Sequence, residues 1–221
     1  MPAHATELLT NGDFETGDFT GWTASTEASS QGSLSIVPNN GGTSPFSGDP
    51  YALNGTGGNF FAISDQTGPG SYSLTQSFTA DGSSDITVSF QLFANSDAGV
   101  AVTDPDRDFN TTPNQNAEVD ILTGGADPFT TSAGDIVATL YGPGADAGAN
   151  PNPWTDYTDD LGVLAAGTYQ IRFAETDNQL FFQMGVDNVS VQANGVPEPA
   201  SLALLGAGIS GLGLVRRRKK G

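Results

Sequence analysis

Residues 86–94 read Ile-Thr-Val-Ser-Phe-Gln-Leu-Phe-Ala, and this segment decides the fold class of the chain. Through Leu92 the even-numbered residues are apolar and the odd-numbered residues between them are polar. A period of two residues is typical of a β-strand that buries one face. The pairs Ile171/Phe173 and Val189/Val191 repeat the pattern. The segment therefore predicts a protein built from β-strands.

Similar short runs recur along the chain. Rich in Val, Ile, Phe, Tyr and Thr, they alternate with clusters of Gly, Asn, Asp, Ser and Pro, as strands alternate with turns. The predicted strands are Leu34–Val37, Phe60–Ile63, Tyr72–Phe78, Ile86–Ala94, Ala117–Leu122, Asp135–Tyr141, Gly167–Glu175 and Phe182–Gln192. We therefore expect an all-β protein, a two-sheet jelly-roll β-sandwich. Ser96–Asn116 and Gly142–Asp160 lack strand character and are expected to form long loops, which are often functional.

The charge of the chain is strongly uneven. It has 25 acidic and 7 basic residues, and five of the basic residues lie in 216–220. The part before residue 196 has 24 acidic residues against Arg107 and Arg172, a formal charge of −22. So negative a body argues against nucleic acid as a partner, because phosphate is bound by cationic side chains. It favours solubility and the binding of cations.

Catalytic chemistry has few candidates in this sequence. Cysteine is absent and His4 is the only histidine, which excludes disulfides, thiolate nucleophiles and, apart from His4, histidine-based triads. Two carboxylates are enough for glycoside hydrolysis, but no pair stands out among so many acids. We therefore expect that the protein is not an enzyme.

The C-terminus has the layout of a sorting signal. A Pro-Glu-Pro motif (Pro197, Glu198, Pro199) precedes an apolar run at 202–215 and five cations at 216–220. Fourteen residues make a helix of about 21 Å, which is short for a hydrocarbon core of about 30 Å. The cations would stay on the cytoplasmic side and leave the body outside. The tail is therefore suited to transient membrane retention, with a permanent tail anchor as the alternative.

This tail resembles the PEP-CTERM sorting domain of bacterial surface proteins, from Val196 to Gly221. The resemblance implies an exosortase-type membrane transpeptidase as partner, which would cut near the Pro-Glu-Pro motif. It also implies a chain that is held briefly in the inner membrane of a Gram-negative bacterium. The processed protein would then reach the cell surface or the extracellular matrix.

The N-terminus contains a second export feature. Ala3 and Ala5 have the small-residue spacing that precedes a signal-peptide cleavage site, although the usual charged and apolar regions are absent. We expect residues 1–5 to be the remnant of a secretory signal peptide, with an ordinary N-terminus as the alternative. The predicted organisation is then the remnant, a sandwich domain at 6–195 and the sorting signal at 196–221.

The two ends of the sandwich carry another resemblance. The opening segment Leu8–Gly17, followed by Gly21-Trp22, and the closing segment Val186–Val191 are similar to those of jelly-roll carbohydrate-binding modules and galactose-binding-like domains. The resemblance implies that the first and last strands are neighbours and that the domain binds a sugar. Trp22 is expected in the core.

The same resemblance implies a structural Ca²⁺ site between the first and last strands. Its ligands would be the backbone carbonyl of Asp13, the side chain of Glu15 and the carboxylate of Asp187, with Asp49 from a loop to complete the shell. Calcium prefers six to eight oxygen ligands, which an acid-rich body can supply. The alternative is that Glu15 and Asp187 cap turns or face solvent.

A second calcium candidate is the alternating set Asp104, Asp106 and Asp108. It echoes the first positions of an EF-hand loop, but Phe109 stands where that loop needs glycine and Gln115 where it needs glutamate. A solvated acidic loop is the preferred interpretation.

Aromatic residues in loops are candidates for stacking on a sugar ring. Trp154 and Tyr157 lie in the second predicted loop, and Tyr51 lies in a polar segment. The alternative is that Trp154 and Tyr157 cover the edge of a sheet.

Three functions are compatible with these observations. The preferred one is a non-catalytic exported protein associated with extracellular polysaccharide or biofilm matrix through its sandwich. The second is an acidic, calcium-binding matrix protein without a sugar site. The third is a carboxylate-dependent glycan hydrolase.

Overall fold

The structure, a computed structural model, describes residues 5–96, 107–110, 113–142 and 153–195. These ranges contain β-strands and no helix, and therefore no helix long and apolar enough to cross a membrane. The strands are β1 (Thr6–Glu7), β2 (Thr23–Thr26), β3 (Gly32–Pro38), β4 (Phe60–Gln66), β5 (Gly70–Ala80), β6 (Ser84–Ser96), β7 (Gln115–Thr123), β8 (Ile136–Tyr141), β9 (Thr155–Val163), β10 (Gly167–Asp177) and β11 (Phe182–Gly195). The predicted C-terminal apolar helix lies outside the described residues.

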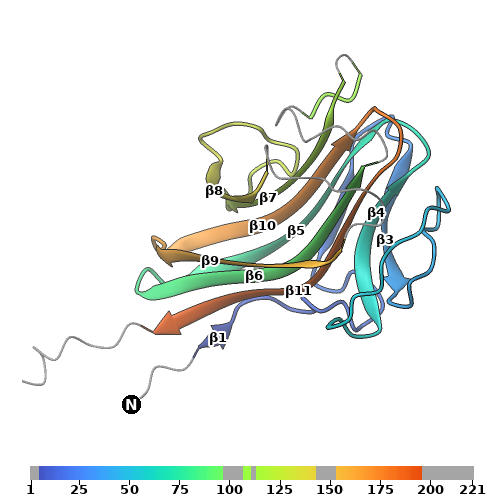
Figure 1. Cartoon of the computed structure of the whole chain (residues 1–221). Helices are drawn as coiled ribbons and strands as arrows, with labels where there is room; N and C mark the ends of the chain where they lie inside the picture. Colours follow the sequence, from blue (N-terminus) through green and yellow to red (C-terminus); the bar gives the residue numbers. More distant parts are fainter. Residues whose placement is uncertain (1–4, 97–106, 111–112, 143–152, 196–221) are drawn as a thin grey trace, which may run out of the picture.

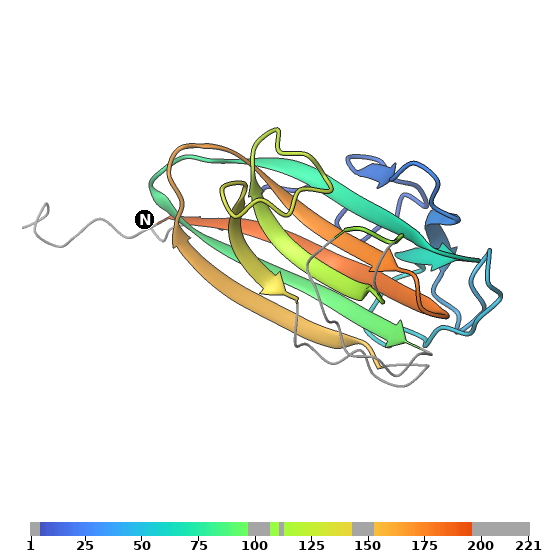
Figure 2. The ribbon, with the colours of Figure 1, turned by 90° about the horizontal axis from the view of Figure 1, so that it is seen from above.

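The strands form two antiparallel sheets that pack face to face (Figure 1). Sheet A has the order β3-β4-β11-β6-β9, with β1 paired to β11, and sheet B has the order β2-β5-β10-β7-β8. Seen from above, the long strands of both sheets run in similar directions (Figure 2). The structure thus confirms the predicted all-β, two-sheet sandwich.

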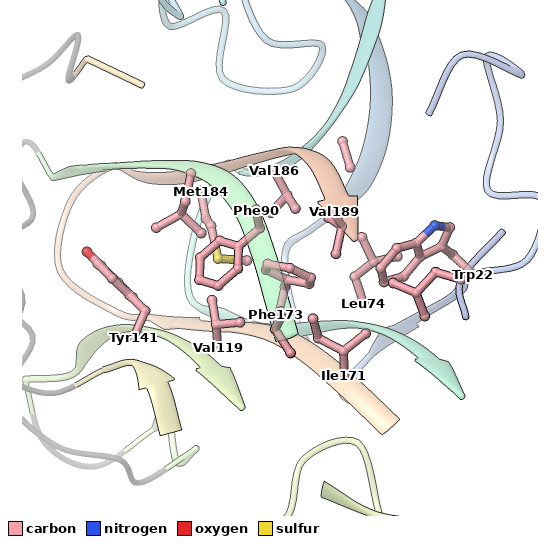
Figure 3. Close-up of a cluster of buried hydrophobic side chains, with 14 of the residues drawn as sticks. Trp22, Leu74, Phe90, Val119, Tyr141, Ile171, Phe173, Met184, Val186 and Val189 are labelled. Carbon is pink, nitrogen blue, oxygen red and sulfur yellow. The ribbon is translucent and has the colours of Figure 1, made fainter. Parts of the chain in front are cut away.

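The core lies between the inner faces of the two sheets (Figure 3). Ile86, Val88, Phe90 and Leu92 of β6 all point into it, as their spacing of two predicts. Phe173 of β10 packs edge-to-face on Phe90, with ring centroids 5.5 Å apart. Burying side chains of this size contributes about 1.5–3 kcal/mol each, so this layer is the main source of stability.

All eight predicted strands are present, and the structure adds β1, β2 and β9. The assignment of Gly142–Asp160 to a loop is wrong from Thr155 onward, because β9 begins there. This strand pairs with β6 alone, at the edge of sheet A, and carries Asp156, Asp159 and Asp160. Charged residues are common on edge strands because they discourage pairing with other chains. They also hide the strand from a search for apolar alternation.

The opening and closing segments of the sandwich are neighbours. The amide of Leu8 donates to the carbonyl of Val191 at 2.8 Å, and the amide of Val189 donates to the carbonyl of Gly12 at 2.8 Å. A Cβ atom at position 12 would lie 1.9 Å from the carbonyl oxygen of Val189, so only glycine allows this approach. The neighbouring ends that the resemblance implied are therefore observed.

Candidate functional site

The two arginines of the body meet on the outer face of sheet B, the face turned away from the core. Arg172 lies on β10 between Ile171 and Phe173, which both point into the core. Because side chains alternate along a strand, Arg172 points to the opposite face. Glu118 and Asp120 of the neighbouring strand β7 point to that same face, since they alternate with core residues.

Arg172 is completely buried, and each of its nitrogens is used. Its Nε and Nη2 donate to Oδ2 of Asp120 at 3.1 and 2.5 Å, and Nη2 lies 3.5 Å from Oε2 of Glu118. Its Nη1 donates to the backbone carbonyls of Pro128 and Thr130 at 3.3 and 2.7 Å. Arg172 therefore fastens the loop between β7 and β8 onto the outer face of the sheet.

Arg107 joins the same network but is incompletely bonded. Its Nη2 forms an ion pair with Oε2 of Glu118. Its Nε and Nη1 have no hydrogen-bond partner, although the residue is only 5% exposed. A buried donor without a partner costs about 1–3 kcal/mol, so an uncompensated pair of donors needs an explanation. A ligand that accepts hydrogen bonds from Nε and Nη1 would remove this cost.

Arg107 lines a pocket of about 310 Å³, which we call the arginine pocket, together with Glu27, Asp108, Asn110, Phe129 and Thr131. Glu27 follows β2, Arg107 to Asn110 precede β7, and Phe129 and Thr131 belong to the β7–β8 loop. Oε2 of Glu27 is buried and has no hydrogen-bond partner. Burial raises the pKa of Glu27, helped by the charges of Asp108 and Asp127 and opposed by Arg107. The residues that line the pocket thus include two with unpartnered polar atoms, Arg107 and Glu27, and one aromatic ring, Phe129.

The aromatic residues predicted to stack on a sugar do not form one platform. Trp154 packs edge-to-face on Phe61 and Phe93, with centroids 5.0 and 4.8 Å apart, and its Nε1 donates to the carbonyl of Ala52. Tyr51 is buried in the same cluster, against Phe61. This position corrects the expectation that Tyr51 is available in a polar loop. Trp154 and Tyr51 cover the outer face of sheet A.

Tyr157 is partly buried and packs against the core instead. It lies on β9, not in a loop, and its ring stacks on Phe90 at 5.1 Å with an interplanar angle of 14°. Tyr141 contacts it edge-on. One face of the Tyr157 ring is therefore occupied, and the ring is separated from the cluster that holds Trp154.

The proposed calcium ligands Glu15 and Asp187 lie against two consecutive glycines, Gly57 and Gly58. Glu15 accepts hydrogen bonds from the amides of Asn59 and Phe60 at 2.5 and 3.0 Å and from the side chain of Asn59 at 2.7 Å. These bonds lower its pKa.

Asp187 lies beside this carboxylate and is completely buried. Its oxygens accept from the amide of Asn188 at 2.7 Å and from Nδ2 of Asn54 at 2.9 Å. No cationic side chain is among these partners. Burial raises the pKa of Asp187 to about 7, and the charges of Glu15 and Asp13 raise it further.

Asp49 does not belong to this group. It lines a pocket with Gln66 and Asp177 at the far end of β4, about 20 Å from the end that Glu15 contacts. Among the described residues, no three acidic or histidine side chains form a group that could hold a metal ion. Each carboxylate oxygen of Glu15 and Asp187 accepts at least one N–H bond. Of the second candidate, Asp104 and Asp106 lie outside the described residues, and Asp108 is half-buried.

We expect the thermal midpoint of the full-length chain to fall as pH rises from 5 to 8. Asp187 has a pKa of about 7 in the folded protein, against a usual value of 3.8, so the folded state binds more protons than the unfolded state between these values. Stability must then decrease as the proton is lost, which is the reverse of the usual behaviour of an ion-paired carboxylate. Differential scanning calorimetry at a series of pH values measures the thermal midpoint.

The matched control is Asp187→Ala, whose midpoint should change less steeply over the same pH range, whatever its absolute value. A midpoint that rises from pH 5 to pH 8 would contradict the argument.

Calcium binding at Glu15 and Asp187 stays a prediction of the sequence. The same scans, run in excess Ca²⁺ and in chelator, test this prediction. Identical thermal midpoints in the two conditions would contradict calcium binding.

Sequence reasoning missed Glu27 and Phe129 and treated Arg107 only as part of an acidic loop. One signal was available: Arg107 and Arg172 are the only basic residues between Thr6 and Gly195. In a body with 24 acids, two isolated arginines are strong candidates for buried ion pairs. The sequence does not reveal that they share one site, because 64 residues separate them.

The C-terminus matches the family described as the PEP-CTERM protein-sorting motif, over residues 195–219. This confirms the prediction made on Pro197, Glu198 and Pro199, which lie outside the described residues. The motif indicates a protein that is exported and sorted to the cell surface, and implies exosortase processing. No curated protein matches the chain significantly.

Solved structures match the sandwich at low identity. One is the enzymatically active domain of tailspike protein 4 from bacteriophage CBA120, with 13% identity and a TM-score of 0.52 over 84% of this chain and 21% of that chain. Another is the K3 cleaved adhesin domain of Lys-gingipain from Porphyromonas gingivalis W83, with 15% identity and a TM-score of 0.51 over 86% and 99%. TmCBM61, solved with β-1,4-galactotriose, matches with 12% identity and a TM-score of 0.48 over 84% and 97%. The similarities to the tailspike and adhesin domains, at 13% and 15% identity, show the β-sandwich fold alone.

Proposed function

We propose that this protein is a non-catalytic, exported surface protein that holds a neutral extracellular polysaccharide in the arginine pocket. The observation that carries the proposal is that Arg107 and Glu27, which both line this pocket, have buried polar atoms without partners: the Nε and Nη1 donors of Arg107 and the Oε2 acceptor of Glu27. A sugar hydroxyl both donates and accepts hydrogen bonds, so one diol can bond both groups. The ring of Phe129 offers an apolar surface for the C–H face of the sugar.

The charge of the pocket supports a neutral ligand. Arg107 and Arg172 are balanced by Glu118 and Asp120, and Glu27 and Asp108 add negative charge at the pocket itself. The body around it is strongly acidic. An anionic polysaccharide would therefore be repelled, whereas a neutral one would lose no charge pairing on binding.

The size of the pocket also supports a sugar. A volume of about 310 Å³ lies at the lower end of the range for small-molecule sites, roughly 300–1,000 Å³. It is suited to one or two sugar units of a longer chain. The sorting motif supports the location, because it indicates a cell-surface protein and the surface is where such polymers occur.

The test is affinity electrophoresis of the full-length chain through gels that contain β-1,4-galactan, xyloglucan or β-1,3-glucan, with alginate as the anionic comparison. We expect retardation by at least one neutral polymer and none by alginate. Arg107→Lys keeps the charge that pairs with Glu118 but lacks the two free donors. It should lose about 1.5–3 kcal/mol of binding free energy, a reduction in affinity of tenfold or more.

The controls use two phenylalanines in loops. Phe129→Ala should weaken retardation, and Phe46→Ala should not, because Phe46 lies in a different pocket. Retardation that is unchanged in both Arg107→Lys and Phe129→Ala would place the sugar elsewhere, and loss on Trp154→Ala alone would favour the outer face of sheet A. No retardation by any neutral polymer would count against polysaccharide binding.

A further inference from the structure

A second pocket, of about 390 Å³, lies at the end of the sandwich formed by the turn between β10 and β11. This is the end of β11 opposite to its pairing with β1 (Figure 1). Gln66 at the end of β4 and Asp177 at the end of β10 form its polar part, and Asp49 lies on its wall. Phe46, Leu180 and Phe181 form its apolar part. We call it the end pocket.

The polar part of the end pocket has an unmet acceptor. Gln66 is 3% exposed; its Nε2 donates to Oδ2 of Asp177 at 3.1 Å, whereas its Oε1 has no hydrogen-bond partner. Glu175, two residues before Asp177 on the same face of β10, is also buried; neither of its oxygens makes a hydrogen bond of good geometry, although the side chains of Ser64 and Gln66 lie near them. These groups therefore present more acceptors than donors, even with the hydroxyl of Tyr72, which lies across from Glu175 on β5 and also has no partner.

Cations are missing as well. The basic side chains of the described residues are Arg107 and Arg172, and both are engaged in the network on the outer face of sheet B. Asp177 and Glu175 point to the inner side of that sheet, in line with Phe173. The protein itself thus provides no partner of opposite charge, and a ligand that brings positive charge and N–H donors would satisfy the site.

The shape of the end pocket distinguishes between two kinds of cation. A bare Ca²⁺ needs six to eight oxygens close around it, but within the described ranges no three acidic side chains form such a group. The pocket is much larger than an ion, and its apolar wall includes two of the most exposed large apolar side chains, Leu180 at 76% and Phe46 at 49%. Leu180 also has a φ of 48°, which is strained for leucine. These features are suited to an organic cation.

We propose that the end pocket binds a primary ammonium group carried on an aliphatic chain. The three N–H donors of the ammonium would bond the carboxylate of Asp177 and Oε1 of Gln66. The methylene groups would pack on Phe46 and Leu180. A free diamine and the lysine side chain of another protein share this chemistry.

The test is isothermal titration of the full-length chain with 1,5-diaminopentane at pH 7.5 and moderate salt. 1,5-Pentanediol provides the same skeleton without charge, and a short lysine peptide with blocked ends represents the protein source. We expect saturable binding of one diamine per chain and none of the diol. Binding of the peptide as well would identify lysine side chains as a source; binding of the diamine alone would identify free amines.

Asp177→Asn should lower the affinity for the diamine at least tenfold. The variant should fold, because the side-chain amide of Gln66 can rotate so that its oxygen accepts from the new side-chain N–H at position 177. The matched control Asp160→Asn removes one exposed charge from β9 and should leave the affinity unchanged. Leu180→Ser, at a largely exposed position, tests the apolar wall without a folding risk and should also weaken binding.

The pH dependence is a second readout. Burial raises the pKa of Asp177 to about 6, so the carboxylate is largely protonated at pH 5 and the affinity should fall about tenfold from pH 7.5. Equal binding of the diol, or equal losses in Asp160→Asn and Asp177→Asn, would overturn the proposal. Displacement of the diamine by Ca²⁺ with higher affinity in the wild type, but not in Asp177→Asn, would also overturn it in favour of a metal site.

Discussion

Replacing Arg172 by alanine should lower the free energy of unfolding by about 3–5 kcal/mol. The variant leaves Asp120 completely buried without its cation and removes the donors for the carbonyls of Pro128 and Thr130. An unpaired buried charge cannot recover its hydration, which is why breaking such a pair costs more than the pair contributes. Urea unfolding of the full-length chain, followed by tryptophan fluorescence, measures the change.

The double variant Arg172→Met/Asp120→Leu is the control. It removes both charges, leaves Glu118 paired with Arg107, and should recover most of the lost stability. If Arg172→Ala alone costs less than about 1 kcal/mol, as exposed ion pairs do, the buried network is not what holds the β7–β8 loop in place.

Replacing Phe173 by alanine should cost about 3–5 kcal/mol, because it opens a cavity in the middle of the core. Phe173 is completely buried and contacts both Phe90 and Trp22, with ring centroids 5.5 and 6.1 Å apart (Figure 3). Through Phe90 it connects the two sheets, and through Trp22 it connects the opening segment to the core. The loss should therefore appear as one cooperative shift of the urea transition.

Phe46→Ala is the matched control, since it removes the same atoms from a side chain that is 49% exposed. Its cost should stay within about 0.5 kcal/mol, as for other surface substitutions. A similar cost for both variants would mean that the core can collapse around the missing ring. A non-cooperative transition in Phe173→Ala would show that the two sheets separate independently.

The two predicted binding pockets lie on opposite sides of sheet B. The arginine pocket lies on its outer face and is suited to a neutral sugar, whereas the end pocket opens beside its inner face and is suited to an ammonium ion. If both predictions hold, the protein would connect a neutral polymer to cationic components of the same matrix. Phe129→Ala and Phe46→Ala separate these activities, because each changes only one pocket.

The strand pattern was readable wherever one face of a strand is buried. Residues such as Phe90 and Ile171 repeat every second position because the pleat sends alternate side chains to opposite faces. The prediction missed β9 because this strand, at the edge of sheet A, carries three aspartates: Asp156 and Asp160 face water, and Asp159 is half-buried opposite Val88. Besides the stacking of Tyr157 on Phe90, this strand is held by backbone hydrogen bonds to β6, which leave no pattern in the side chains.

The sequence by itself determined the all-β class, the two-sheet sandwich and the sorting motif, because each is written in neighbouring residues or in a period of two. The tertiary structure alone decided which polar residues form sites. It brought Arg107 to Glu27 and Phe129, placed Asp49 beside Asp177, and placed Trp154 and Tyr157 in separate clusters. Those outcomes depend on strand order and on loops that cross the sheets. Distance along the chain therefore carries no information about them.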